Sequence, residues 1–132
     1  MSSPAPILNA SLPSSFRQIR IELAREKGHP DGAHNIAYAI VAPLDDDGHI
    51  DTESWRHHRE ACRVARLRPG EATVHGHLVH RRGGSWAFEY GADIPDESGY
   101  HFNEERFVPG EYVSVNEDGR MHPFRVVSVA RL

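Results

Sequence analysis

Hydrophobic and polar side chains alternate along much of the chain after residue 15, which indicates strands rather than helices. Residues 17–24 alternate three aliphatic side chains with polar neighbours, as expected for a strand with one buried face. Residues 35–42 are apolar on both faces and predict a central strand. The polar segment between them contains Pro30-Asp31-Gly32, a turn sequence.

One helix is predicted near residues 52–60. Asp51 is a suitable N-cap, because its side chain can accept a hydrogen bond from the first turn. Ile50 and Trp55 stand before the cap and at the fourth helical position, the spacing of a hydrophobic staple.

The sequence Asp118-Gly119 predicts a β-hairpin with a two-residue loop, since both residues tolerate a positive φ. Such a loop pairs Val113 with Phe124 and Val115 with His122, so that all four share one face. 

A second hairpin is predicted to turn at Arg82-Gly83 or at Gly83-Gly84. Either two-residue loop assigns the side chains to the same two faces of the hairpin. The face with three aromatic residues is expected to be buried in the core. The residues expected on that face are His75, His77, Val79, Trp86, Phe88 and Tyr90. A three-residue loop would reverse the assignment, because a shift of one residue turns every side chain to the other face.

Seven or eight short strands and one short helix predict a mainly β protein, with α+β as the alternative. Hairpin connections favour a small antiparallel β-barrel or a curved β-sandwich. Residues 1–15, rich in proline and serine, are predicted to be a flexible tail. Residues 16–132 are predicted to form a single β-rich domain, because 132 residues suit one core.

The composition restricts the cellular setting. The single cysteine, Cys62, cannot form an internal disulfide, which favours a reducing compartment and makes the cytoplasm the expected location. No segment approaches the ~20 apolar residues that a membrane helix needs. The N-terminus lacks the basic and apolar regions of a signal peptide.

Charge is distributed unevenly around a net value of −4. Residues 56–82 contain seven arginines against two glutamates, and residues 89–118 contain nine acidic residues against one arginine. The acidic balance argues against general nucleic-acid binding, which needs a basic field. The arginine cluster can hold a small anion or phosphate, or it can pair with the acidic stretch of the same chain, which we favour. This cluster comprises Arg56, Arg59, Arg63, Arg66 and Arg68.

Ten histidines are the unusual feature of the composition. Most fall in predicted loops, but several fall on predicted strands beside aromatic residues. They define a candidate ligand pocket of His75, His77, Trp86, Phe88, Tyr90 and His122. A histidine on an apolar face can also be a hydrogen-bonded core residue, or a general acid or base near neutral pH.

Gly70 followed by His75 and His77 resembles the first motif of the cupin family over about a dozen residues. This resemblance implies a divalent metal at His75 and His77, which project to one side of a strand. The sequence departs from the pattern at Arg81 and Arg82, where cupins place a glutamate.

Two loops contain ligand-type residues. Residues 45–51 match part of a calcium-binding loop, but Pro43 and Ser54 stand where two ligands belong, so we interpret the segment as a turn. Residues 28–35 include two histidines and an aspartate in a polar turn, where ligands are often bound.

The sequence shows no Ser-His-acid or Cys-His order, and no catalytic residue is assigned. Our main hypothesis is a small cytosolic β-barrel-like module that binds a small molecule or a protein, without catalysis, cofactor or membrane. The alternative is a small enzyme that uses histidine as acid, base or metal ligand, and the third is an anion binder. Pro123 removes a ladder donor, so residues 121–129 are predicted as an edge or bulged strand through which a homodimer could form.

Overall fold

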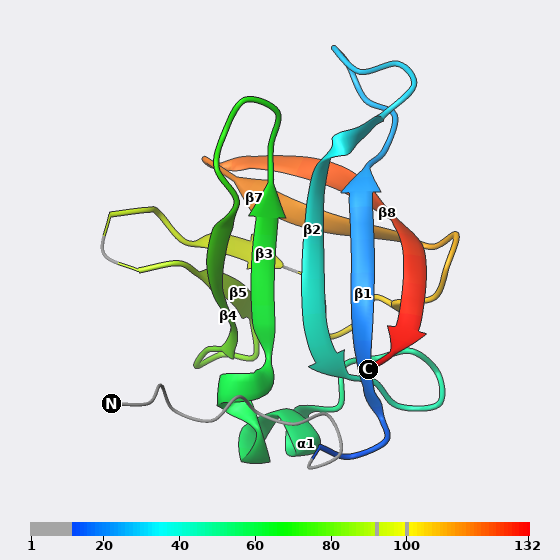
Figure 1. Ribbon diagram of the computed structural model, residues 1–132, viewed down its shortest axis with the longest axis vertical. Helices are drawn as coiled ribbons and strands as arrows, with labels where there is room; N and C mark the ends of the chain where they lie inside the picture. Colours follow the sequence, from blue (N-terminus) through cyan, green and yellow to red (C-terminus); the bar gives the residue numbers. More distant parts are fainter. Residues whose placement is uncertain (1–11, 92, 100) are drawn as a thin grey trace, which may run out of the picture.

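The computed structural model describes residues 12–91, 93–99 and 101–132. Eight antiparallel strands form a closed barrel in which each strand pairs with the next in sequence and β8 pairs with β1 (Figure 1). The strands are β1 (Phe16–Leu23), β2 (Ala33–Pro43), β3 (Arg63–Leu67), β4 (Val74–His80), β5 (Trp86–Glu89), β6 (Glu97–Gly99), β7 (Tyr112–Glu117) and β8 (Arg120–Arg131). The predicted antiparallel barrel with one short helix is confirmed.

The helix α1 (Thr52–His57) begins as predicted, with the Asp51 side chain accepting a hydrogen bond of 3.1 Å from the Ser54 amide. It ends earlier than predicted, because His58 leaves the helical conformation at φ −139°. The His58 ring nitrogen Nδ1 lies 2.9 Å from the Ser54 carbonyl oxygen, which satisfies that acceptor. A 3₁₀ turn (Arg59–Ala61) then leads into β3.

The hairpin of β7 and β8 has the predicted register. Val113 pairs with Phe124 and Val115 with His122, around a loop of Asp118 and Gly119. Both loop residues have positive φ, 52° and 75°, which fits a two-residue turn that matches the twist of the strands.

The predicted register of the β4–β5 hairpin is wrong by one residue. Leu78 pairs with Phe88 and His80 with Trp86, around a loop of residues 82–84. The loop has three residues rather than two, because the Arg81 amide donates to the Ser85 carbonyl oxygen at 2.8 Å. This shift turns His75 and His77 to the outer face, opposite to Trp86 and Phe88.

Of the two alternatives predicted for residues 121–129, the edge strand is wrong, because the barrel closes through β8. The bulge is present, since the β1–β8 register shifts between Arg20, opposite Ser128, and Ile21, opposite Val126. Residues 120–125 of β8 pair with β7, and residues 124–131 pair with β1. Pro123 lies opposite Ser114, and its carbonyl oxygen accepts a 2.9 Å hydrogen bond from the Ala24 amide. The premise for a homodimer through a free edge at this strand is therefore removed.

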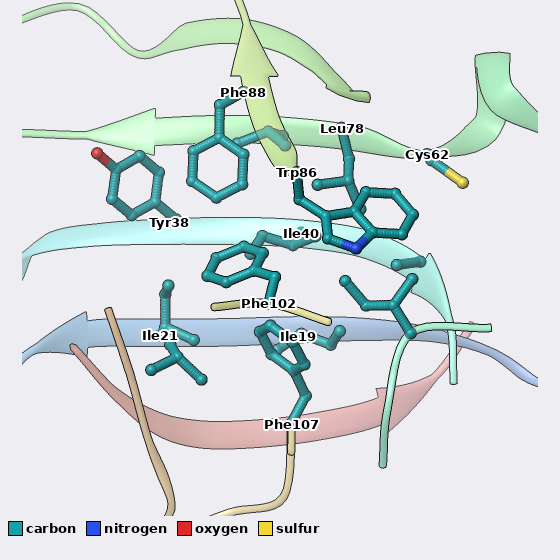
Figure 2. Close-up of a cluster of buried hydrophobic side chains, with 14 of the residues drawn as sticks. Ile19, Ile21, Tyr38, Ile40, Cys62, Leu78, Trp86, Phe88, Phe102 and Phe107 are labelled. Carbon is teal, nitrogen blue, oxygen red and sulfur yellow. The ribbon is translucent and has the colours of Figure 1, made fainter. Parts of the chain in front are cut away.

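The two ends of the barrel differ. At the closed end, α1 and its flanking loops cover the lumen, and the Trp55 indole N–H donates to the Leu78 carbonyl oxygen at 2.9 Å (Figure 1). At the open end lie the β1–β2, β3–β4, β5–β6 and β7–β8 connections. Aromatic and aliphatic side chains fill the lumen between them, with the Tyr38 hydroxyl at one edge of the cluster and Trp86 and Cys62 toward the other (Figure 2).

The predicted N-terminal tail falls largely outside the described residues, which begin at residue 12. From there the chain already contacts the barrel: Leu12 packs against the core, and the Ser15 carbonyl oxygen accepts a 3.1 Å hydrogen bond from Leu44. Among the described residues, no helix has the length and apolar character needed to cross a membrane.

Candidate functional site at the open end of the barrel

The inward-facing side chains change from apolar to polar toward the open end. In β3 the inner row runs from Val64 to Arg66, and in β7 it runs from Val115 to Glu117. Every odd strand ends here and every even strand begins here, so these polar residues meet. The resulting polar cluster comprises Tyr38, Arg66, Arg68, Tyr90, Glu97, Glu117 and His122.

Glu97 is the centre of the polar cluster and is only 5% exposed. Its Oε1 accepts hydrogen bonds from the hydroxyls of Tyr38, at 2.9 Å, and Tyr90, at 2.5 Å. Its Oε2 lies 2.9 Å from the Arg68 guanidinium and 3.4 Å from that of Arg66. Both oxygens of the buried carboxylate are therefore paired, as burial of a charge requires.

The two tyrosines remain hydroxyl donors. Burial, together with the negative charges of Glu97 and Glu117, raises the pKa of Tyr38 far above its usual value. Burial and the hydrogen bond to Glu97 likewise raise the pKa of Tyr90. Tyr38 also contacts Glu117 but has a single proton, so it can donate to only one carboxylate at a time.

Arg68 supplies the second partner of Glu117, at 3.4 Å. Partial burial lowers the pKa of Arg68, but the charges of Glu117 and Glu97 outweigh it and raise the pKa overall. The guanidinium therefore remains cationic and ties the two carboxylates together.

His122 lies between two carboxylates at the edge of the polar cluster. Its Nδ1 is 2.9 Å from Glu26, and its Nε2 is 3.8 Å from Glu117. Because a carboxylate only accepts, Nδ1 carries the proton in the bond to Glu26. A carboxylate that fixes a histidine in this way orients it for proton transfer.

The tight turn of residues 26–29 holds Glu26 in place. The Glu26 amide donates to the His29 carbonyl oxygen at 3.1 Å, and the His29 amide donates back at 2.9 Å. Gly28, at φ 92°, allows the chain to reverse between them.

A cavity of about 280 Å³ opens above the polar cluster, and we call it the open-end cavity. Part of its wall is apolar and part is charged. It is lined by Leu23, Glu26, His29, Ile36, Arg68, Pro69, Glu71, Glu117 and His122. Its mixed lining and position at the mouth of a barrel are typical of small-molecule sites.

The predicted His/aromatic pocket is divided between two places. His122 belongs to the open end, whereas Trp86 and Phe88 are buried core residues. His75 and His77 lie exposed on the outer face of β4, in a groove of about 470 Å³ that is also lined by Tyr90, whose hydroxyl reaches Glu97 at the open end.

The group of residues that could hold a metal ion does not lie at the predicted metal site of His75 and His77. Among the described residues, the group with three converging ligand atoms is Asp45, Asp47 and His49, and it includes neither His75 nor His77. Asp45 already accepts hydrogen bonds from the Asp47 and His49 amides, which is the behaviour of a turn.

The five arginines of the predicted anion site do not form one surface. Arg66 and Arg68 point into the barrel and pair with Glu97. On the helical segment, Arg56 pairs with Glu53, and the Arg59 guanidinium lies 4.9 Å from the Trp55 ring; Arg63 faces the outer groove. The inward pair thus finds its partner in the acidic stretch of residues 89–118.

Sequence reasoning missed Tyr38, Glu26, Glu97 and Glu117. For Tyr38 and Glu117 a signal exists, because each occupies an inner strand position at the same end of the barrel as Arg66 and His122. Glu97 gives no such signal, since its strand has only three residues within an acidic segment.

Comparisons of this chain with protein-family models, curated proteins and solved structures found no match. The site is interpreted from its own geometry and chemistry.

Proposed function

We propose that this chain is a small-molecule-binding barrel that takes its ligand in the open-end cavity. The observation that supports the proposal most strongly is the cavity itself, a mixed apolar and polar hollow directly above a buried, hydrogen-bonded polar cluster. A volume of about 280 Å³ suits a small ligand rather than a macromolecular segment.

The polar cluster supports a functional rather than a purely structural role. Replacing a buried network of charges by well-packed hydrophobic residues is often neutral or stabilising, so the network is not the simplest way to fill a barrel. Here it borders the cavity through Arg68, Glu117 and His122. The outer groove borders the polar cluster through Tyr90 alone, and its side chains His75, His77 and Glu89 are exposed.

Blocking the cavity tests the proposal. In a screen of small polar fragments by NMR, hits should perturb the methyl resonances of Leu23 and Ile36. The substitution Ile36→Trp should abolish these hits, because the indole would occupy the cavity, whereas Val41→Trp, on the outer face, should leave them unchanged. Hits that bind Ile36→Trp as well as the original protein would contradict the proposal.

A second candidate function is proton-transfer catalysis in the same cavity. His122, oriented by Glu26 and lining the cavity, favours it. A fragment that binds there and has an acidic C–H bond should then exchange that hydrogen with D₂O. The substitution His122→Gln should abolish exchange while leaving affinity within about threefold; exchange that is unaffected would exclude this role.

The proposal retains the cytoplasm as the location on the ground of composition. The single cysteine, Cys62, is a buried free thiol. Localisation of the tagged protein in its native cell tests this part.

A further inference from the structure

The charges around the open-end cavity are unequal. Its lining includes three carboxylates, of Glu26, Glu71 and Glu117, but only one guanidinium, of Arg68, and two imidazoles. The carboxylates outnumber the guanidinium three to one, which favours a positively charged ligand.

The arginines near the cavity already form ion pairs with carboxylates of the protein. Arg68 contacts Glu97 at 2.9 Å and Glu117 at 3.4 Å, and Arg66 contacts Glu97 at 3.4 Å. An entering anion would have to compete with these carboxylates for the guanidinium groups.

Glu26 is the carboxylate of the cavity wall without a guanidinium partner, since Glu117 lies 3.4 Å from Arg68 and Glu71 lies 3.9 Å from Arg66. The partner of Glu26 is the His122 ring, and within the part of the chain that the structure describes Glu26 forms no ion pair with arginine or lysine. Its side chain is 20% exposed, so a ligand can reach it while much of its surface is shielded from water.

The remaining wall is apolar and selects for more than a bare ion. Leu23, Ile36 and Pro69 also line the cavity and can contact a short aliphatic chain. A bare divalent metal fits less well, because Glu26, Glu117 and His122 do not form a group of converging ligand atoms among the described residues.

We propose that the ligand of the open-end cavity is an organic cation, an amine or guanidine with a short aliphatic part. This inference rests on the proposed binding function. The ammonium or guanidinium group binds at Glu26, and the aliphatic part packs on Leu23 and Ile36.

Three probes with the same carbon chain test the charge preference: n-butylammonium, n-butanol and butyrate. Each is titrated into methyl-labelled protein at equal ionic strength, and the Leu23 and Ile36 methyl resonances are followed. We expect saturable shifts with n-butylammonium in the millimolar range and at least about tenfold weaker binding of the other two.

Matched variants locate the charge that selects the ligand. Glu26→Gln should weaken n-butylammonium binding by about five- to tenfold, whereas Glu117→Gln should weaken it by less than about threefold, because the Glu117 carboxylate already pairs with Arg68. Glu53→Gln removes the same charge from α1 at the closed end and should leave binding unchanged. Because Glu26 is partly exposed, its variant should fold, which a near-UV circular dichroism spectrum checks.

The outcomes separate this inference from the proposed function. Butyrate or n-butanol binding as tightly as n-butylammonium at the same methyls would overturn the cationic class and leave the cavity a binding site. Saturable shifts from none of the three probes would count against both. Equal loss of affinity in Glu53→Gln and Glu26→Gln would overturn the assignment of the charge to the cavity.

Discussion

Glu97 is the residue on which the charge balance of the open end depends. Two tyrosine hydroxyls and two guanidinium groups bind its carboxylate, which is the nearest carboxylate to both Arg66 and Arg68. Breaking a buried ion pair on one side leaves the other charge unpaired, which destabilises a protein more than the intact pair stabilises it.

The substitution Glu97→Gln should therefore lower the free energy of unfolding by about 3 kcal/mol, since Arg66 and Arg68 lose their nearest carboxylate, which is buried. Urea unfolding measures the change. Glu53→Gln removes an exposed carboxylate, 69% accessible, and should stay within about 0.5 kcal/mol. A loss below about 1 kcal/mol for Glu97→Gln would contradict the role of this residue.

Cys62 lies toward the closed end of the lumen, where the side chains are apolar. It is fully buried, and burial raises the pKa of its thiol to about 12. A thiol that is not ionised is a poor nucleophile.

We therefore expect native Cys62 to react with Ellman's reagent at pH 8 far more slowly than the urea-unfolded chain. Since the folded pKa is raised, the free energy of unfolding should fall as the pH rises from about 9, the ordinary value, toward 12. Equal reaction rates in the folded and unfolded states would show that the thiol is accessible.

At the scale of elements, the inner face of β4 determines how Tyr90 enters the lumen. Gly76 lies opposite Val64 on that face. A Cβ atom added there would lie 2.3 Å from the Glu89 carbonyl oxygen and 2.8 Å from the Tyr90 ring. The absence of a side chain lets β5 approach β4 closely and directs the Tyr90 hydroxyl to Glu97.

The substitution Gly76→Ala should therefore destabilise the barrel by about 1–3 kcal/mol, as overpacking does. It should also displace the Tyr90 ring, which NMR of ring-labelled tyrosine detects. A variant with unchanged stability and an unchanged Tyr90 resonance would disprove the close approach.

At the scale of the whole molecule, the pairing of β1 with β8 closes the sheet into one barrel, and the same strands run from its open end to its closed end. Both tryptophans, Trp55 and Trp86, lie toward the closed end, whereas Tyr38 and Tyr90 report on the open end. Tryptophan fluorescence and fluorotyrosine NMR should therefore give coincident urea transitions, as in two-state unfolding. An earlier tyrosine transition would show that the open end unfolds independently.

The sequence was sufficient to predict the fold but only fragments of the site. Alternation and turn residues predicted the barrel, the helix start at Asp51 and the β7–β8 register, because these depend on local chemistry. The prediction of the β4–β5 register was wrong because the loop between Arg81 and Ser85 has three residues rather than two. Gly83 and Gly84 are compatible with either loop length, so the local sequence does not decide between them. Glu97 required the closed barrel to bring it to Arg66 and Arg68.

Ligand binding in the open-end cavity is tested most directly by a crystal structure of the protein soaked with a mixture of small polar fragments. We expect fragment density in this cavity, in contact with Leu23 or Ile36 and within hydrogen-bond distance of Glu26. Density confined to the outer groove of His75 and His77, with the open-end cavity holding water alone, would contradict this expectation.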